Sequence, residues 1–556
     1  MKKINILFIS FCLITILISA CKKDFLNEKV LDKYAPTSLN DKLGFEASAV
    51  GLYNHLAWFY ENADDQTWLN MFYLGTDITW NPQSKTGGSS RNYHDYTTLT
   101  ATDGGASRLW TWCYKLINNS NILIYNAEKN NPTGMSQSEK DAYNGEARFF
   151  RAYAYNMLAT LYGGVPLVTE PLTQPKTDFV RAALADVNAV IEKDLLFAVN
   201  SLPEIDAAKE ARSNKAMARQ LLAEYYLRTN QAAKAEEQCT AIITSGKFKL
   251  VTSRYGSTST PGDAFSDMFK IGKQRRGQGN TEVIWILEQE NPTDVPNGSV
   301  GSPQQRRNWQ AAYHNIAGMK ICDSLGGRGL SRIRLDDWVL YKLYDKTDMR
   351  NSQYSIRRQF YFNDPSAKYA AVYGKPVPYG KDATFDLGGT NGTIKIAAAD
   401  TIANITPYTT KWAQFDPRDE FGYGDWKDFI LMRLGETYLL RAEARLKQNN
   451  TQGAADDINI LRVRAQAPTV DASKIDLNFI LDERARELIA EENRRMTLVR
   501  TGTLVERAKR LCGTAKVANG NIETTNGIQD YNMLLPIPDT EIKLNKDAKL
   551  LQNPGY

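Results

Sequence analysis

Two stretches of this 556-residue chain share one pattern: Leu221-Leu-Ala-Glu-Tyr-Tyr-Leu-Arg-Thr-Asn230 with Ala235 after it, and Leu440-Arg-Ala-Glu-Ala-Arg-Leu-Lys-Gln-Asn449 with Ala454 after it. Leucine, alanine, glutamate and asparagine recur in both at the same spacing, with no gap. Small residues let two helices approach closely, and the asparagine marks the turn between them. This is typical of tetratricopeptide helix pairs, whose repeat is about 34 residues. The segment Ser213–Gly246 covers one such unit, so the pattern predicts a helical-repeat framework.

Helical periodicity extends through the N-terminal half of the chain. Apolar side chains in Tyr143–Tyr162 fall on one face at helical spacing, and Gly163 can end that helix. A second helix is predicted from about Asn214 to Arg228, with Ser213 as its candidate N-cap.

A second helical region begins at Asp428 and includes a highly charged stretch, Asp476–Val499. Within it, the pairs Asp482–Arg486 and Glu491–Arg495 stand four residues apart, which supports a helix. We interpret these charges as a solvated helix face.

The region between the two helical parts, about residues 247–427, has a different composition. Gly, Pro, Asn, Ser and Asp are scattered through it, and short strand-like runs occur at Glu282–Leu287 and Thr393–Ala397. Loops this long inside a compact protein are usually functional or disordered. We therefore expect an irregular mixed region inserted into the helical framework.

The N-terminus has the features of a secretory signal. Two lysines precede the apolar run Ile4–Ile18, and the small residues Ser19 and Ala20 lead to Cys21. The segment ending at Cys21 resembles a bacterial lipobox, in which the cysteine becomes acylated. Several acyl chains on one residue give stable membrane anchoring. An ordinary signal peptide that happens to contain a cysteine is the alternative reading.

Composition argues against several classes of function. The net charge of +5 is close to balanced and loses two positive residues with the signal, so we expect no nucleic-acid partner. The three histidines, His55, His94 and His314, lie far apart, which disfavours a histidine metal site and histidine-based nucleophilic catalysis. The four cysteines left after Cys21 share no CxxC spacing, and Cys113 and Cys239 are expected to be buried thiols.

Four further motifs identify a family, in an order that spans the chain. The first is Gly145-Glu-Ala-Arg-Phe-Phe-Arg-Ala-Tyr-Ala-Tyr-Asn156 with Leu161-Tyr-Gly-Gly-Val-Pro-Leu167, and the second is Arg433-Leu-Gly-Glu-Thr-Tyr-Leu-Leu-Arg-Ala-Glu-Ala444. The third is Glu483-Arg-Ala-Arg-Glu-Leu488, and the fourth is Leu535-Pro-Ile-Pro-Asp539 with Gln552-Asn-Pro-Gly-Tyr556. In these motifs, and in the start Cys21-Lys-Lys-Asp-Phe-Leu26, the chain resembles the SusD/RagB family.

The resemblance implies a mainly α fold, a tetratricopeptide-like helical repeat scaffold with a loop-rich mixed insertion. The expected division is a lipoprotein signal peptide at 1–20 and one SusD-like domain at 21–556, with its scaffold at about 41–246 and 428–512, the variable region at about 247–427 and a C-terminal tail at 513–556. Members of the family are outer-membrane lipoproteins that face the cell exterior and bind nutrient, usually glycan. They deliver it to a SusC-type TonB-dependent transporter and have no catalytic activity. The resemblance implies neither a cofactor nor a metal, and lipid attachment at Cys21.

Aromatic residues in polar loops are the candidates for glycan contact, since flat rings can pack on the apolar faces of sugars while polar neighbours bind hydroxyls. Trp80 lies in the polar loop Gly75–Arg91, and Trp309 in the variable region is a second candidate. The alternative reading for each is packing on the protein's own core. The full predicted ligand-binding set is Tyr73, Asp77, Trp80, Asn81, Arg91, Trp309 and Tyr313.

Two other classes of function stay open. A surface glycoside hydrolase needs two carboxylates across a cleft, but Asp336-Asp337 and Asp456-Asp457 are adjacent residues that point in different directions. A lipoprotein of the same transporter complex that binds peptide, or only protein, is the other alternative.

Overall fold

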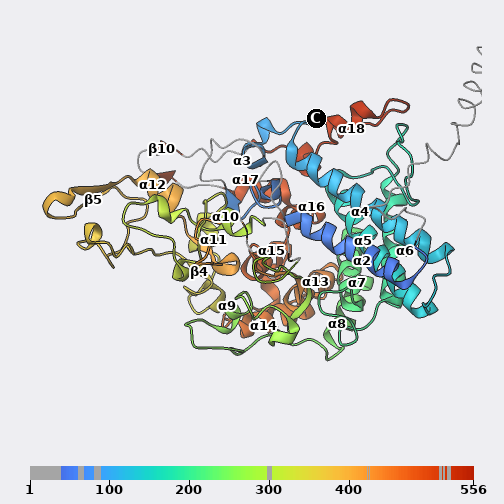
Figure 1. Ribbon diagram of the computed structural model, residues 1–556, viewed down its shortest axis with the longest axis horizontal. Coiled ribbons are helices and arrows are strands. Elements are labelled where there is room, and N and C mark those ends of the chain that lie inside the picture. Colours follow the sequence, from blue (N-terminus) through green and yellow to red (C-terminus); the bar gives the residue numbers. More distant parts are fainter. Residues whose placement is uncertain are drawn as a thin grey trace, which may run out of the picture.

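The computed structural model describes residues 39–60, 68–80, 89–296, 298, 303–422, 424, 426–512, 516–517, 520–521 and 527–556. Seventeen α-helices lie in these residues, and the strands among them are short. The N-terminal helices gather at one end of the molecule, the irregular region forms the other end, and the C-terminal helices lie between them (Figure 1). The mainly helical fold class predicted from the sequence is confirmed.

The N-terminal helices pack in order along the chain, since α4 contacts α5, α5 contacts α6, α6 contacts α7 and α7 contacts α8. Their bounds are α2 (Lys42–Tyr60), α3 (Ser89–His94), α4 (Gly104–Lys129), α5 (Gln137–Tyr162), α6 (Leu184–Ser201), α7 (Lys215–Arg228) and α8 (Ala232–Ile243). The helix predicted over 143–162 is confirmed as the larger part of α5. A capping box between Ser136 and Glu139 begins it, and Gly163, at φ +79°, ends it.

The two copies of the repeated pattern form two helix pairs. The first is α7 with α8, and the second is α13 (Leu434–Lys447) with α14 (Thr451–Arg464). Asn230 and Asn449, the matched turn residues, both have φ +61°, a left-handed conformation that asparagine tolerates better than most residues. Ala235 and Ala454 are fully buried, and α8 packs directly on α13. The predicted pairing and the role of the asparagines are therefore confirmed.

The N-cap prediction for α7 is wrong by one residue. Asn214 is the N-cap, since its side-chain oxygen accepts hydrogen bonds from the backbone N–H of Ala216 and Met217. Ser213 instead accepts a hydrogen bond from the Tyr53 hydroxyl. An asparagine next to the serine could satisfy the same helix donors, so sequence alone did not separate them.

The charged stretch 476–499 is not a solvated helix face, which corrects the sequence interpretation. It forms α15 (Leu477–Leu488) and α16 (Arg494–Arg500), followed by α17 (Leu504–Leu511). Glu487 is buried and pairs with Arg350, Arg433 and Arg464. The partners lie far away in the sequence, so the spacing within the helix could not reveal them.

The irregular region carries short helices, and the strands of the described residues, within it and outside it, form two-stranded antiparallel pairs. The helices are α9 (Ala264–Asp267), α10 (Gln305–Trp309), α11 (Asp337–Tyr341) and α12 (Ala398–Asn404), and α18 (Asp539–Leu544) lies near the C-terminus. The strand pairs are β1 (Thr79–Trp80) with β3 (Arg334–Leu335), β2 (Val283–Leu287) with β8 (Phe429–Arg433), β4 (Ile356–Arg357) with β7 (Tyr408–Thr409), β5 (Ala383–Asp386) with β6 (Thr393–Ile396), and β9 (Lys516–Val517) with β10 (Gly520–Asn521). Both strands predicted from the sequence, β2 and β6, are confirmed.

One large apolar core runs through the helical parts, and a smaller one lies within the irregular region around Tyr313, Phe360 and Phe362. Cys113 and Cys239 are buried free thiols, as expected. Among the described residues, none of the helices combines the length and the apolar character needed to span a bilayer.

Candidate functional site

A polar pocket lies where the β2–β8 pair ends. All five side chains of β2 are buried. The strand pairs with β8, which leads directly into α13. Gln289 follows β2 and Asp428 precedes β8, and the backbone N–H of Gln289 donates to Asp428 Oδ1 at 2.9 Å. This fixes both chain segments at the pocket, whose volume is about 490 Å³.

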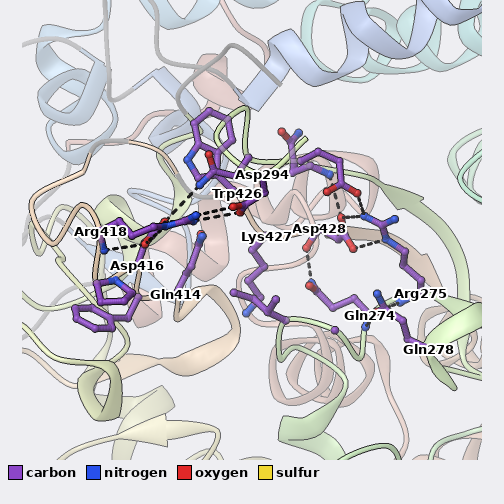
Figure 2. Close-up of a pocket in the computed structure, with 17 residues that line it drawn as sticks. Gln274, Arg275, Gln278, Asp294, Gln414, Asp416, Arg418, Trp426, Lys427 and Asp428 are labelled. Atoms are coloured by element: carbon purple, nitrogen blue, oxygen red, sulfur yellow. Dashed lines mark hydrogen bonds and ion pairs between the residues drawn. The ribbon is translucent and has the colours of Figure 1, made fainter. Parts of the chain in front are cut away.

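Arg275 and Asp428 form one side of the pocket (Figure 2). Arg275 donates to Asp428 from Nε at 2.8 Å and from Nη2 at 3.0 Å, and it also donates to Glu290 at 2.7 Å. The hydrogen bond to Asp428 raises the pKa of Arg275 above its usual range, against the opposing effect of burial. Gln274 donates to the backbone carbonyl of Asp428. The charges on this side are therefore paired within the protein.

Arg418 and Asp416 form the opposite side of the pocket, with Gln414 and Lys427 between the two sides (Figure 2). Arg418 donates to Asp416 at 2.7 Å and to Asp294 at 2.5 Å. These hydrogen bonds hold the pKa of both carboxyl groups below their usual range. The Lys427 ammonium donates to the backbone carbonyls of Lys411 and Ala413, so it supports the loop before the pocket.

Two buried glutamine side chains in the pocket lining have polar atoms without a hydrogen-bond partner among the described residues. They are Gln414 Oε1, an acceptor, and Gln289 Nε2, a donor. Gln414 is only 8% exposed and Gln289 only 3%. Leaving such groups unsatisfied costs about 1–3 kcal/mol each, so a side-chain rotation that brings either amide to a ligand hydroxyl would be favoured.

Two half-buried aromatic rings, Trp426 and Phe415, complete the lining. Small-molecule sites are usually lined mostly by apolar side chains, with a few polar groups that fix orientation; in this pocket the polar groups are the majority and the two rings supply apolar contact area. Four acidic and three basic side chains line the pocket, which leaves one negative charge in excess. This arrangement suits a polar, uncharged ligand with an apolar face.

Five of the seven ligand residues predicted from the sequence are buried. Trp309 packs on Tyr73, with ring centroids 4.9 Å apart, and the guanidinium of Arg334 lies over the Trp80 ring at 4.7 Å. Tyr313 donates to the Gly327 carbonyl at 2.8 Å. The residues concerned are Tyr73, Asp77, Trp80, Trp309 and Tyr313.

The structure therefore brings Tyr73 and Trp309 together but gives none of these five residues an open surface. The indole N–H of Trp80 and that of Trp309 find no hydrogen-bond partner in the part of the chain that is described. Arg91 is exposed on α3, and Asn81 and Cys21 lie outside the described residues. Contact of these residues with a ligand, and lipid attachment at Cys21, stay predictions.

The polar pocket itself was not singled out from the sequence. Its residues come from three separate stretches, 271–278, 289–294 and 414–428, each of which reads as an ordinary polar loop. The one local signal was Trp426, a tryptophan in the glycine-rich and aspartate-rich run 416–428. Arg306 of α10 connects this pocket to the predicted site, because it donates to the carbonyls of Gln414 and Gly422.

Known proteins that resemble this chain belong to one family. A family model described as "SusD family" matches residues 265–556, and one described as "Starch-binding associating with outer membrane" matches residues 25–227. The SusD-like protein P25 of Formosa agariphila is 23% identical over 546 residues, covering 94% of each chain. The starch-binding protein SusD of Bacteroides thetaiotaomicron is 25% identical over 480 residues, covering 81% of this chain and 79% of that protein.

Among solved structures, a laminarin-binding SusD-like protein superimposes with a TM-score of 0.66 and 20% identity, covering 93% of this chain and all of the other. At this identity the likeness establishes the fold alone.

Proposed function

Because the chain belongs to the SusD family, we propose that it is a glycan-binding lipoprotein of the outer membrane that delivers its ligand to a SusC-type TonB-dependent transporter. The family match over residues 265–556 supports binding as the function, and the second match, to proteins associated with the outer membrane, supports the location. The names of two relatives, which bind starch and laminarin, support a glycan as the nutrient.

The observation that carries the proposal is the pair of buried, unpartnered atoms in the polar pocket, Gln414 Oε1 and Gln289 Nε2. A sugar hydroxyl donates one hydrogen bond and accepts others, so neighbouring hydroxyls can satisfy both atoms. The half-buried Trp426 lines the same pocket. A peptide could also bond to the amides, but it would present fewer groups that both donate and accept.

The paired charges in the pocket favour an uncharged glycan. Arg275 is held by Asp428 and Glu290, and Arg418 by Asp416 and Asp294. An anionic sugar would have to compete with these carboxylates for the arginines and would meet a lining with one negative charge in excess. The pocket thus resembles a site for hydroxyl groups more than one for sulfate or uronate.

Two of the four carboxyl groups in the pocket lining are poorly suited to acid catalysis. A glycosidase acid needs a carboxyl whose pKa is raised so that it stays protonated. Asp294 and Asp416 instead have pKa values below their usual range, because Arg418 donates to both. These two carboxyls are therefore poor proton donors at neutral pH.

Calorimetry on the purified protein, with malto-oligosaccharides and laminari-oligosaccharides, tests the binding function. We expect saturable binding of at least one series and no new reducing ends after prolonged incubation. Binding of none of these glycans would count against the proposal for these sugars, and release of reducing ends would favour the hydrolase alternative.

The anchor and the partner need separate experiments. Replacing Cys21 with Ala should move the protein from the membrane to the soluble fraction, and protease added to intact cells should cleave an outward-facing protein. Gentle solubilisation of the membranes should recover the protein together with the transporter. A protein that stays with membranes as the alanine variant, or that is fully protected from protease, would contradict the anchor or the orientation.

A further inference from the structure

A second cavity of about 530 Å³ adjoins the polar pocket. Ile271, Gln414, Phe415 and Lys427 line both, so the two meet along this strip of four residues. We call the second one the aromatic cavity. Both volumes fall within the range of about 300–1,000 Å³ that is usual for small-molecule sites.

The lining of the aromatic cavity complements that of the polar pocket. Rings and aliphatic side chains dominate it, with Phe269, Leu325, Tyr354 and Tyr408 among them. The Tyr408 hydroxyl donates to the Leu325 carbonyl at 2.8 Å, which turns the polar end of that ring into the protein. Tyr354 is half-buried and keeps part of its ring accessible. This cavity can therefore contact the apolar faces of sugar rings.

Polar side chains also line the aromatic cavity. Arg357, on β4 and directly across from Tyr408 on β7, donates from Nη2 to the Ser324 carbonyl at 2.8 Å, while its Nε is buried and has no partner within the described residues. Ser324 is exposed at the cavity. The exposed Ser324 hydroxyl and the half-buried Arg357 guanidinium therefore place hydrogen-bonding groups beside the rings.

The strip shared by the two cavities also has features of a binding surface. Ile271 is 58% exposed, although it is a large apolar side chain, and Phe415 beside it is half-buried. Gln414, whose side chain carries a buried acceptor without a partner among the described residues, is part of this strip. A ligand that passed from one cavity to the other would cover this apolar surface and lie beside the Gln414 amide.

We propose that the aromatic cavity is a second subsite and that the ligand is an uncharged oligosaccharide long enough to cross the strip at Ile271 and Gln414 and occupy both cavities. This inference rests on the proposed function, because it extends the same binding site. A single sugar unit would leave one cavity to solvent, so affinity should rise with chain length until both are filled.

Calorimetry with the malto- and laminari-oligosaccharide series, from one to six units, tests this directly. For the series that binds, we expect affinity to rise by about tenfold or more between the shortest binding member and the plateau. Tyr354→Ala should remove most of that rise and leave the shortest binding member nearly unchanged, whereas Tyr354→Phe, which keeps the ring, should behave as the unaltered protein. Ile271→Arg, at an exposed position where the two cavities meet, provides a second variant that should fold and should reduce the rise of affinity with chain length.

The outcomes separate the two proposals. Thermal unfolding of each variant, measured first, shows that the fold is intact. If Tyr354→Ala and Ile271→Arg both keep the full dependence on chain length, the second subsite is overturned while glycan binding stands. If affinity is the same from the shortest member to the longest, the subsite is likewise overturned. If no member of either series binds, the result counts against the proposed function and against the subsite with it.

Discussion

Arg494 donates two hydrogen bonds to Asp77, from Nε at 2.8 Å and from Nη2 at 2.6 Å, and both side chains are fully buried. Arg507 donates to the same carboxylate at 2.6 Å. Asp77 precedes β1, whereas the two arginines belong to α16 and α17, more than 400 residues later. This contact joins the N-terminal part of the chain to its C-terminal helices.

Replacing Asp77 with Asn should destabilise the protein strongly. The variant would leave Arg494 and Arg507 buried with reduced compensation for their charges, and breaking a buried pair typically costs about 3–5 kcal/mol. Denaturant unfolding measures the loss. The matched control is Asp294→Asn, which removes a carboxylate from an exposed ion pair with Arg418 and should leave the free energy of unfolding nearly unchanged. Equal effects of the two substitutions would contradict this account.

Stability should fall on acidification. Burial alone would raise the pKa of Asp77 and of Glu487, but Arg494 holds the first below its usual range and Arg464, Arg433 and Arg350 hold the second well below. Because the folded-state pKa is depressed, the stabilisation is complete above the unfolded-state value of about 4 and is lost as the pH falls through the folded-state pKa.

The free energy of unfolding, measured from pH 7 to pH 3, should therefore decline below about pH 4. The decline should persist at 1 M salt, since buried pairs are screened much less than exposed ones. A stability that stays flat to pH 3 would show that these ion pairs contribute no pH dependence.

Trp309→Ala tests whether that ring is core or ligand site. The ring is 1% exposed and packs on Tyr73, so its removal should lower the free energy of unfolding by about 3–5 kcal/mol. Calorimetry on the same variant, at a temperature where it stays folded, measures glycan binding. Weaker binding with little change in stability would instead support the ligand contact predicted from the sequence.

Trp426→Ala should instead weaken glycan binding and leave stability nearly unchanged. Its ring is half-buried at the polar pocket, so the variant should lose about tenfold in glycan affinity while its melting temperature changes little. Tyr373→Ala is the matched control, because Tyr373 is 56% exposed and lines neither the polar pocket nor the aromatic cavity. Equal glycan affinity of the two variants would show that Trp426 does not contact the ligand.

Anionic glycans should bind more weakly than neutral ones of the same length. The reason is that Arg275 and Arg418 are already paired with carboxylates, so no basic side chain of the pocket is free of an internal contact. Sulfated and unsulfated forms of one oligosaccharide, compared by calorimetry at low salt, provide the measurement. Tighter binding of the sulfated form would show that the arginines exchange their partners.

The sequence by itself determined the helical framework, because helix formation and turns depend on neighbours a few residues apart. The matched asparagines 230 and 449 show this most clearly, since both lie at the turn that their position in the repeat predicts, and the structure adds that both are left-handed. The strands β2 and β6 and the end of α5 at Gly163 were readable for the same reason.

Only the tertiary structure decided which charges are buried and where a ligand can enter. In the sequence, Glu487 has the pattern of an exposed helix residue. In the structure, Arg350 and Arg433, from other parts of the chain, form ion pairs with it. In the same way, Gln289 and Gln414 meet at one pocket although 125 positions separate them in the sequence. The burial of a charge and the shape of a cavity depend on which distant segments come together, and the local pattern of residues does not indicate those contacts.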